Sequence, residues 1–296
     1  MDSLSILGKH FVSTHVSELG APKPIYITTD DVVAVALEAL RSYQVGAVII
    51  NDENDVLQGI FSERDVLTKL SDSSCKIEET PISDLMTASP EVVKPNASIA
   101  RAIHMMVVGG YRHIPIVFAR SMVKSICSVK GVVDHVYKLL VAREEGLDIF
   151  KDDRGLVDQF FAQNLRVLNP CDPSPIVVSS DDTVQHAIQA LCKNSIGSVV
   201  VLENSGSVAG IFTERDYLQN FTDCCSNPDA LVSEFMTSKP RMLTENDTVE
   251  LAFQVMSQGG FRHIPVLNIS GQLCGVLSVR SFMQHLAHCI IEELED

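Results

Sequence analysis

Two sequence motifs occur twice in this chain, in the same order and about 150 residues apart. The first is Gly59-Ile-Phe-Ser-Glu-Arg-Asp65, which returns as Gly210-Ile-Phe-Thr-Glu-Arg-Asp216. The second is Gly109-Gly-Tyr-Arg-His-Ile-Pro115, which returns as Gly259-Gly-Phe-Arg-His-Ile-Pro265. Self-similarity at a fixed period is the signature of internal duplication. The chain is therefore expected to hold two copies of one module, with functional residues in the repeated motifs.

The length and composition favour a folded protein of two domains. The chain has 296 residues, 46% of them hydrophobic, which is ample for packed cores. No apolar run approaches the roughly 20 residues that span a bilayer. The N-terminus lacks the pattern of a signal peptide, and the eight cysteines show no C-x-x-C spacing. We therefore expect a cytoplasmic protein with buried, reduced thiols.

The charge of the chain restricts its partners. A net charge of -15 argues against sequence-independent binding to DNA or RNA, because neutralising phosphates needs a basic surface. A small anionic ligand is still compatible with this charge, since a few arginines focused in one cleft can hold a nucleotide on an acidic protein.

Hydrophobic periodicity predicts a β-α-β-β-α unit that occurs four times. In its first copy the unit has strands at 25–27, 46–50 and 56–60 and helices at 32–40 and 62–70. The fold class is thus α/β (α+β). The expected organisation is an N-terminal segment (1–23), a first module (24–140, units 24–72 and 89–140), a helical connector (141–172) and a second module (173–296, units 173–222 and 239–290).

These features resemble the CBS domain family, named for cystathionine β-synthase. The resemblance rests on the four-fold unit order, the turns ending at Asp65 and Asp216, the strands Arg112-His-Ile-Pro115 and Arg262-His-Ile-Pro265, and the segments Asp84-Leu-Met-Thr87 and Glu234-Phe-Met-Thr237. It implies that two units pack pseudo-symmetrically into a Bateman module with two clefts. The layout is similar to the gamma subunit of AMP-activated protein kinase. The two modules would form one disc within the chain or pair between chains as a homodimer.

The turns ending at Asp65 and Asp216 have two interpretations. Each is a capping box, in which Ser62 or Thr213 begins a helix and the aspartate reaches back to a backbone N–H. The second and fourth units begin the same helix with Gly131 and Ser281 at the acidic position. Building the unit therefore does not need a carboxylate, which favours a ligand role. An ionised carboxylate suits paired ribose hydroxyls, and a hydroxyl at a helix N-terminus suits a phosphate.

The Arg-His pairs also have two interpretations. Adjacent strand residues face opposite ways, so one side chain of each pair would pack and the other would meet solvent. The family resemblance implies instead that they contact ligand phosphates. Arg112 and His113 would complete the cleft of Ser62 and Asp65, and Arg262 and His263 that of Thr213 and Asp216. Arginine supplies a fork of donors, and histidine a pH-sensitive one.

The other cleft of each module lacks these groups. It would join Ser128–Gly131 to the strand at 46–50, or Ser278–Ser281 to the strand at 197–201, without a ribose carboxylate or a strand cation. We therefore expect one competent site per module and two per chain. Adenine would lie near positions that are equally ordinary core positions: Ile25, Tyr26 and Ala47 in the first module, and Ile176, Val177 and Ser198 in the second.

The leading hypothesis is a non-catalytic regulatory protein. It would bind AMP, ADP or ATP, or alternatively S-adenosylmethionine or NAD, and transmit a conformational change to an unidentified partner protein. It would bind no nucleic acid, enter no membrane and need no further cofactor. A constitutive oligomerisation scaffold is the alternative. An enzyme is the third option, and it is disfavoured because the four units leave too little chain for a catalytic domain.

Overall fold

Each repeat folds as its periodicity predicts, into a short sheet with helices. The computed structural model describes residues 3–71, 75–118, 122–144, 161–168 and 174–295. The first unit contains β1 (Tyr26–Thr28), α2 (Val33–Ser42), β2 (Ala47–Asn51), β3 (Leu57–Ser62) and α3 (Glu63–Leu70). The second contains α4 (Ile99–Gly109), β5 (His113–Val117), β6 (Val123–Ser128) and α5 (Val129–Glu144). The predicted first strand of that second unit is reduced to a bridge between Val93 and Ile116.

The second module repeats this order. Its first unit contains β7 (Val177–Ser179), α7 (Val184–Asn194), β8 (Ser198–Leu202), β9 (Val208–Thr213), α8 (Glu214–Gln219) and α9 (Phe221–Ser226). Its second unit contains β11 (Leu243–Thr244), α10 (Val249–Gly259), β12 (His263–Leu267), β13 (Leu273–Ser278) and α11 (Val279–Glu295). Short 3-10 helices at Val16–Leu19, Ile82–Asp84, Leu165–Leu168 and Val232–Glu234 join these elements.

The strand order follows from the unit. In the first unit β1 pairs parallel with β2, and β2 forms an antiparallel hairpin with β3. The segment after the unit adds β4 (Thr87–Ala88) beside β3, and β10 (Thr237–Ser238) lies beside β9 in the same way. The threonines of the two Met-Thr segments are thereby brought next to the turns that end at Asp65 and Asp216.

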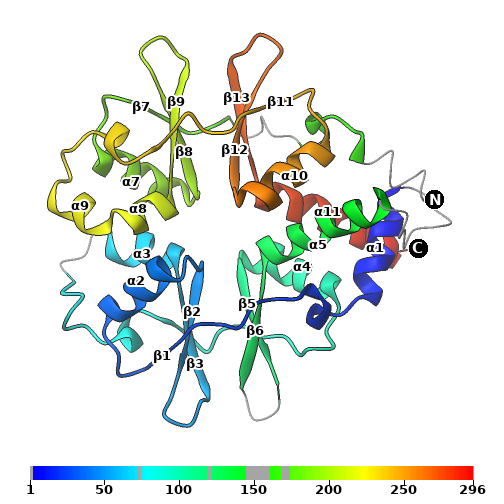
Figure 1. Cartoon of the computed structure of the whole chain (residues 1–296), viewed down its shortest axis with the longest axis horizontal. Coiled ribbons are helices and arrows are strands. Elements are labelled where there is room, and N and C mark those ends of the chain that lie inside the picture. Colours follow the sequence, from blue (N-terminus) through cyan, green and yellow to red (C-terminus); the bar gives the residue numbers. More distant parts are fainter. Residues whose placement is uncertain (1–2, 72–74, 119–121, 145–160, 169–173, 296) are drawn as a thin grey trace.

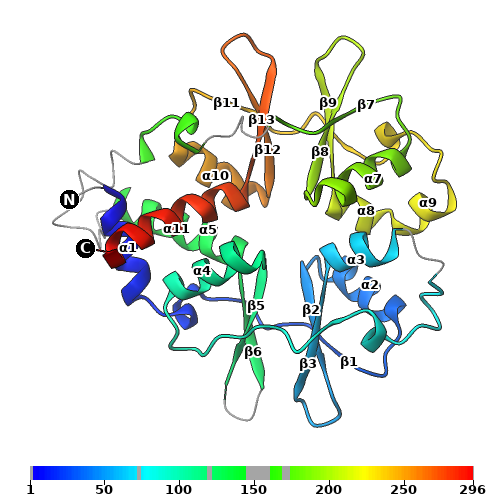
Figure 2. The same cartoon turned by 180° about the vertical axis from the view of Figure 1, so that it is seen from behind.

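The four units form one disc within the chain (Figures 1 and 2). Inside the first module, sheet residues Ala47, Ile49 and Ile60 cluster with Val123 of the partner unit. Between the modules, helices meet: α3 packs on α8, α5 on α10, and α4 on α11. The clefts of a module therefore lie between its two units, and the inner ends of α3 and α8 meet where the modules join.

Two hydrophobic cores hold the modules together. One contains helix residues of the first and third units, including Leu40, Leu67 and Leu218. The other contains residues of the second and fourth units and of α1 (Ser3–Ser13), including Phe11, which is fully buried. Because each core is shared between modules, apolar burial stabilises the disc as one unit.

The N-terminal segment forms the helix α1, which contacts both modules. It packs against α11 of the second module as well as against α4 of the first, so it bridges the two. Much of the predicted helical connector, at 145–160 and 169–173, lies outside the described residues.

The structure also bears on the expected reduced thiols and on the expectation that the chain does not enter a membrane. In the described part of the chain five cysteines are free thiols, but Cys274 is disulfide-bonded, so the expectation of a reduced thiol is wrong for Cys274. In the part of the chain that the structure describes, every helix is too short or too polar to cross a lipid bilayer.

Candidate functional site

The repeated acidic turns are true capping boxes. Asp65 Oδ2 accepts hydrogen bonds from Ser62 N at 2.8 Å and from Ser62 Oγ at 2.6 Å. Asp216 makes the same two contacts with Thr213, at 2.8 and 2.6 Å. Each carboxylate oxygen accepts about two hydrogen bonds, so the cap uses Oδ2 fully and the capacity for a ligand lies on Oδ1. The two roles of these aspartates are compatible.

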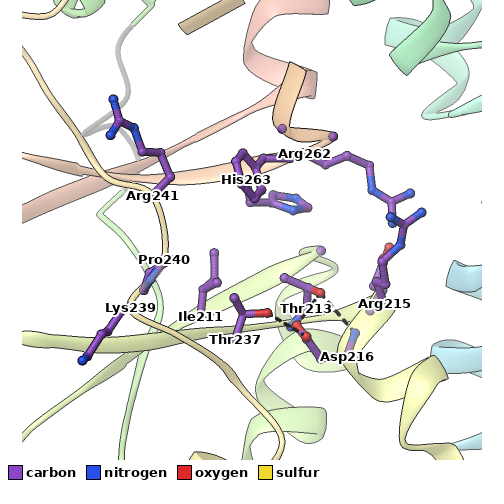
Figure 3. A pocket seen from close by; sticks show the side chains of 15 residues that line it. Ile211, Thr213, Arg215, Asp216, Thr237, Lys239, Pro240, Arg241, Arg262 and His263 are labelled. Atoms are coloured by element: carbon purple, nitrogen blue, oxygen red, sulfur yellow. Dashed lines mark hydrogen bonds between the residues drawn. The ribbon is translucent and has the colours of Figure 1, made fainter. Parts of the chain in front are cut away.

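The second oxygen of each aspartate is in a different environment. Asp65 Oδ1 is 2.6 Å from Lys69 Nζ and accepts a 3.3 Å hydrogen bond from Thr87. Asp216 Oδ1 accepts a 3.0 Å hydrogen bond from Thr237 (Figure 3). The residue corresponding to Lys69 is Asn220, whose amide donates to the Asp216 backbone carbonyl instead. Lys69 thus neutralises Asp65, whereas the charge of Asp216 remains available to a ligand.

Burial has an electrostatic effect on Asp216. It raises the pKa of this carboxyl above its usual value, against the hydrogen bonds from Thr213 and Thr237 that lower it. The ionised form is therefore under-stabilised in the free protein. A hydrogen bond from a ligand to Oδ1, such as one from a ribose hydroxyl, would stabilise the ionised form.

The histidines of the Arg-His pairs stay within their own modules. A Cβ atom at Gly46 would lie 2.6 Å from His113 Nε2, and one at Gly197 would lie 2.8 Å from His263 Nε2, so the rings occupy space that only glycine leaves open. Burial first, and then Arg112 and Arg262, lower the pKa of each histidine to about 3. Both are neutral near pH 7, which corrects the expectation of a pH-sensitive donor.

The arginines cross to the opposite module. Arg112 Nη2 lies 2.5 Å from Glu214 Oε2, and Arg262 Nη2 pairs with Glu63 Oε2. Arg64 Nε and Arg215 Nε complete the set, each 3.2 Å from the same two glutamates, Glu214 and Glu63 respectively. We call these four arginines and two glutamates the central cluster. Sequence reasoning placed Arg112 and Arg262 only in the clefts of their own modules and missed the other four residues.

Both glutamates of the central cluster are buried, and the neighbouring arginines favour the ionised form of Glu63. Their side chains are 2% exposed. Burial is the largest single influence and raises the pKa of Glu63, but the charges of Arg262, Arg215 and Arg112 and the hydrogen bond from Arg262 together lower it, so the net shift is downward. Four arginines against two glutamates leave two positive charges at the centre of an otherwise acidic protein. That excess is suited to attracting an anion.

A pocket of about 380 Å³ opens beside Asp216. We call it the Asp216 pocket. Its polar lining includes Thr213, Asp216, Thr237, Lys239, Arg241, Arg262 and His263. In Figure 3 the acidic turn lies on one side, with Arg241, His263 and Arg262 opposite. The structure therefore brings Thr213, Asp216, Arg262 and His263 together, and it adds two basic residues from the segment before β11.

A second pocket, of about 420 Å³, lies at the cleft that the sequence indicated to be degenerate. We call it the Ser281 pocket, because Ser278 and Ser281 line it. The strand of this cleft carries no cation, as expected, but Arg64, Arg112 and Arg280 line the pocket from other elements. The cations were missed because two of them come from the other module.

The adenine positions expected in the second module fall outside the Asp216 pocket. Ile176 and Ser198 line the Ser281 pocket instead, and Val177 is 43% exposed and lines neither pocket. The reason is the pseudo-twofold packing: a cleft takes its acidic turn from one unit and its first-strand segment from the partner unit. In the Asp216 pocket the partner segment is Lys239-Pro240-Arg241.

The first module shows the same separation. Tyr26 donates a 2.6 Å hydrogen bond to the Val123 carbonyl of the partner unit, and Ala47 is buried against Val123. Ile25 packs on the core shared by the first and third units. Ser62 and Asp65 lie at the turn, and His113 lies against Gly46 at the neighbouring strand.

A protein-family model describes the chain as four copies of one domain. The model for the CBS domain matches residues 16–72, 82–136, 168–223 and 232–288. The chain belongs to the CBS domain family. Its two modules are therefore tandem Bateman modules, and the resemblance inferred from the repeated motifs is confirmed.

Relatives of this CBS domain chain are known in sequence and in structure. CBS domain-containing protein CBSCBSPB1 of Arabidopsis thaliana is 26% identical over 93% of the chain and 53% of its own length. Meiotically up-regulated gene 70 protein of Schizosaccharomyces pombe is 21% identical over 89% of the chain and 42% of its own length. The chain spans about half the length of these curated relatives.

Two solved structures share the fold. Protein MJ1225 of Methanocaldococcus jannaschii, proposed as an archaeal homologue of γ-AMPK, superposes with a TM-score of 0.75 at 15% identity, covering 93% of this chain and all of its own. A conserved protein from Pyrococcus horikoshii gives 0.60 at 18% identity, covering 92% of this chain and all of its own. At these identities the likeness concerns the architecture alone.

Proposed function

We propose that this CBS chain is a non-catalytic regulatory protein that binds an adenine nucleotide in the Asp216 pocket. The observation that carries the proposal is the pairing in one pocket of an under-stabilised carboxylate with the cations Lys239, Arg241 and Arg262. A ribose diol offers two donors to the carboxylate, and a phosphate offers acceptors to the cations. AMP, ADP, ATP and NAD carry both groups, whereas S-adenosylmethionine carries the ribose diol without a phosphate.

The ligand would contact both units of the second module. Asp216 and Thr213 belong to one unit, and Arg241, Arg262 and His263 to the other. A ligand shifts an equilibrium between two arrangements only when its affinity for them differs, and a ligand that bridges two units can meet this condition. The change would reach a partner protein in the cytoplasm through the disc, whose modules share both cores.

Thermal unfolding of the full chain with AMP, ADP, ATP, S-adenosylmethionine and NAD tests the proposal. A ligand present at 100 times its dissociation constant should stabilise the fold by about 2.7 kcal/mol, a shift of several degrees. Absence of any shift would favour the constitutive scaffold. Chromatography of the same samples would show whether the ligand is consumed. Consumption would indicate an enzyme and contradict a purely regulatory role.

A further inference from the structure

Each buried glutamate of the central cluster holds the arginines of one pocket. Glu63 pairs with Arg215 and Arg262, and both of these line the Asp216 pocket. Glu214 pairs with Arg64 and Arg112, and both of these line the Ser281 pocket. The acid comes from one module in the first case and from the other in the second. The arrangement is reciprocal across the join between modules.

The arginines stand between their glutamate and their pocket. In Figure 3 the side chains of Arg215 and Arg262 meet at one end of the Asp216 pocket, consistent with their common partner Glu63. The Glu63 side chain is 2% exposed, whereas that of Arg215 is 43% exposed. The anion is thus shielded from solvent while its cations face the pocket.

We propose that Glu63 is a built-in counter-anion for the Asp216 pocket, and that it sets how strongly the pocket prefers ligands with more phosphate charge. This inference rests on the proposed function, because it concerns the same pocket. Glu63 occupies donors of Arg262 and reduces the positive potential that an entering phosphate meets. Two charges a few ångströms apart in a partly buried site interact strongly. Removing the charge of Glu63 should therefore change the affinity of the pocket for a phosphate.

The same contact gives the ligand a route to the first module. Glu63 is the first residue of α3 and directly follows Ser62, which caps the first-module turn. A phosphate that draws Arg262 toward the pocket removes one of the two ion pairs of Glu63 in the central cluster and leaves the pair with Arg215. Binding of a ligand in the second module would therefore change the ion pairing of Glu63 at the acidic turn of the first module.

The test compares Glu63→Gln with the unaltered chain by calorimetric titration of adenosine, AMP and ADP. Glu79→Gln is the matched control, because it makes the same change in net charge at an acid that is 70% exposed and paired with Lys76. We expect Glu63→Gln to tighten AMP binding about tenfold, to tighten ADP binding further and to leave adenosine unchanged. Glu79→Gln should alter none of the three by more than about twofold.

Two results would overturn the inference alone. One is unchanged AMP binding by Glu63→Gln, and the other is weaker AMP binding, which would mean that Glu63 positions Arg262 for the ligand. An unaltered chain that binds none of the three ligands would overturn the proposed function together with the inference. If Glu63→Gln fails to fold, Glu63→Asp keeps the charge but shortens the side chain, and should tighten AMP binding by a smaller factor without affecting adenosine.

Discussion

The clefts around Asp65 and Asp216 carry the same motif and differ in the charges around it. In the first module Lys69 binds the aspartate, whereas Asn220 at the corresponding position of the second module does not. The segment on the far side of the Asp216 pocket is Lys239-Pro240-Arg241. Its first-module counterpart is Ser89-Pro90-Glu91. The second module thus has an available carboxylate with a basic rim, and the first has a neutralised carboxylate with an acidic residue near it.

This difference shows that the motif fixes the position of the aspartate carboxylate. The neighbouring charges determine whether that carboxylate is available to a ligand. Both turns place the aspartate identically, with the same two capping distances. The sequence motif therefore predicted two equivalent sites. The surrounding charges favour the second module for a nucleotide, and substitutions in the two modules can test this ranking.

The largest difference is expected for the aspartates themselves. Asparagine keeps an acceptor for the capping N–H but loses the charge that a ribose diol would engage. Asp216→Asn should weaken AMP binding by about 10- to 100-fold, as loss of a charge-assisted hydrogen bond does. Asp65→Asn should weaken it by less than about threefold, because Lys69 already occupies that carboxylate. Calorimetric titration measures both, and a greater loss for Asp65→Asn would reverse the ranking of the modules.

A smaller effect is expected when the rims are exchanged. Lys239→Ser combined with Arg241→Glu gives the second module the rim of the first. Because these residues are exposed, each charge is screened, and we expect AMP to bind about three- to tenfold more weakly in 0.05 M salt and less so in 0.5 M salt. Adenosine should be unaffected in both salt concentrations. An equal loss for adenosine would mean that the rim shapes the pocket and does not act through its charge.

The elements of the fold were predictable because each has a local signal. The apolar spacing predicted a helix at 32–40, and α2 spans Val33–Ser42. The strand predicted at 46–50 is β2, which is buried along its length. Such patterns act within a few residues of the chain, so one sequence was enough to locate them.

The site was only partly predictable because its composition depends on contacts between units. No local pattern tells that Arg262 reaches Glu63, which is almost 200 residues away in the chain. The same holds for Ile176 and Ser198, which face the turn of the partner unit. A signal for the central cluster was nevertheless present. The Glu-Arg pair is repeated inside both acidic turns, although capping needs only the first and last residues of the turn.

The smallest expected effect comes from releasing Asp65 in the first module. Lys69→Asn reproduces Asn220 and removes the 2.6 Å ion pair with Asp65. Since the pair is partly exposed, its loss should cost less than about 1 kcal/mol in the free energy of unfolding. The freed carboxylate should strengthen AMP binding at the first module by a few-fold, seen in calorimetry as a larger contribution from a second, weaker site. Lys76→Asn, which removes an exposed lysine of the same module, is the control and should leave the titration unchanged. Unchanged titrations for both variants would show that the acidic Glu91, and not Lys69, sets the difference between the two clefts.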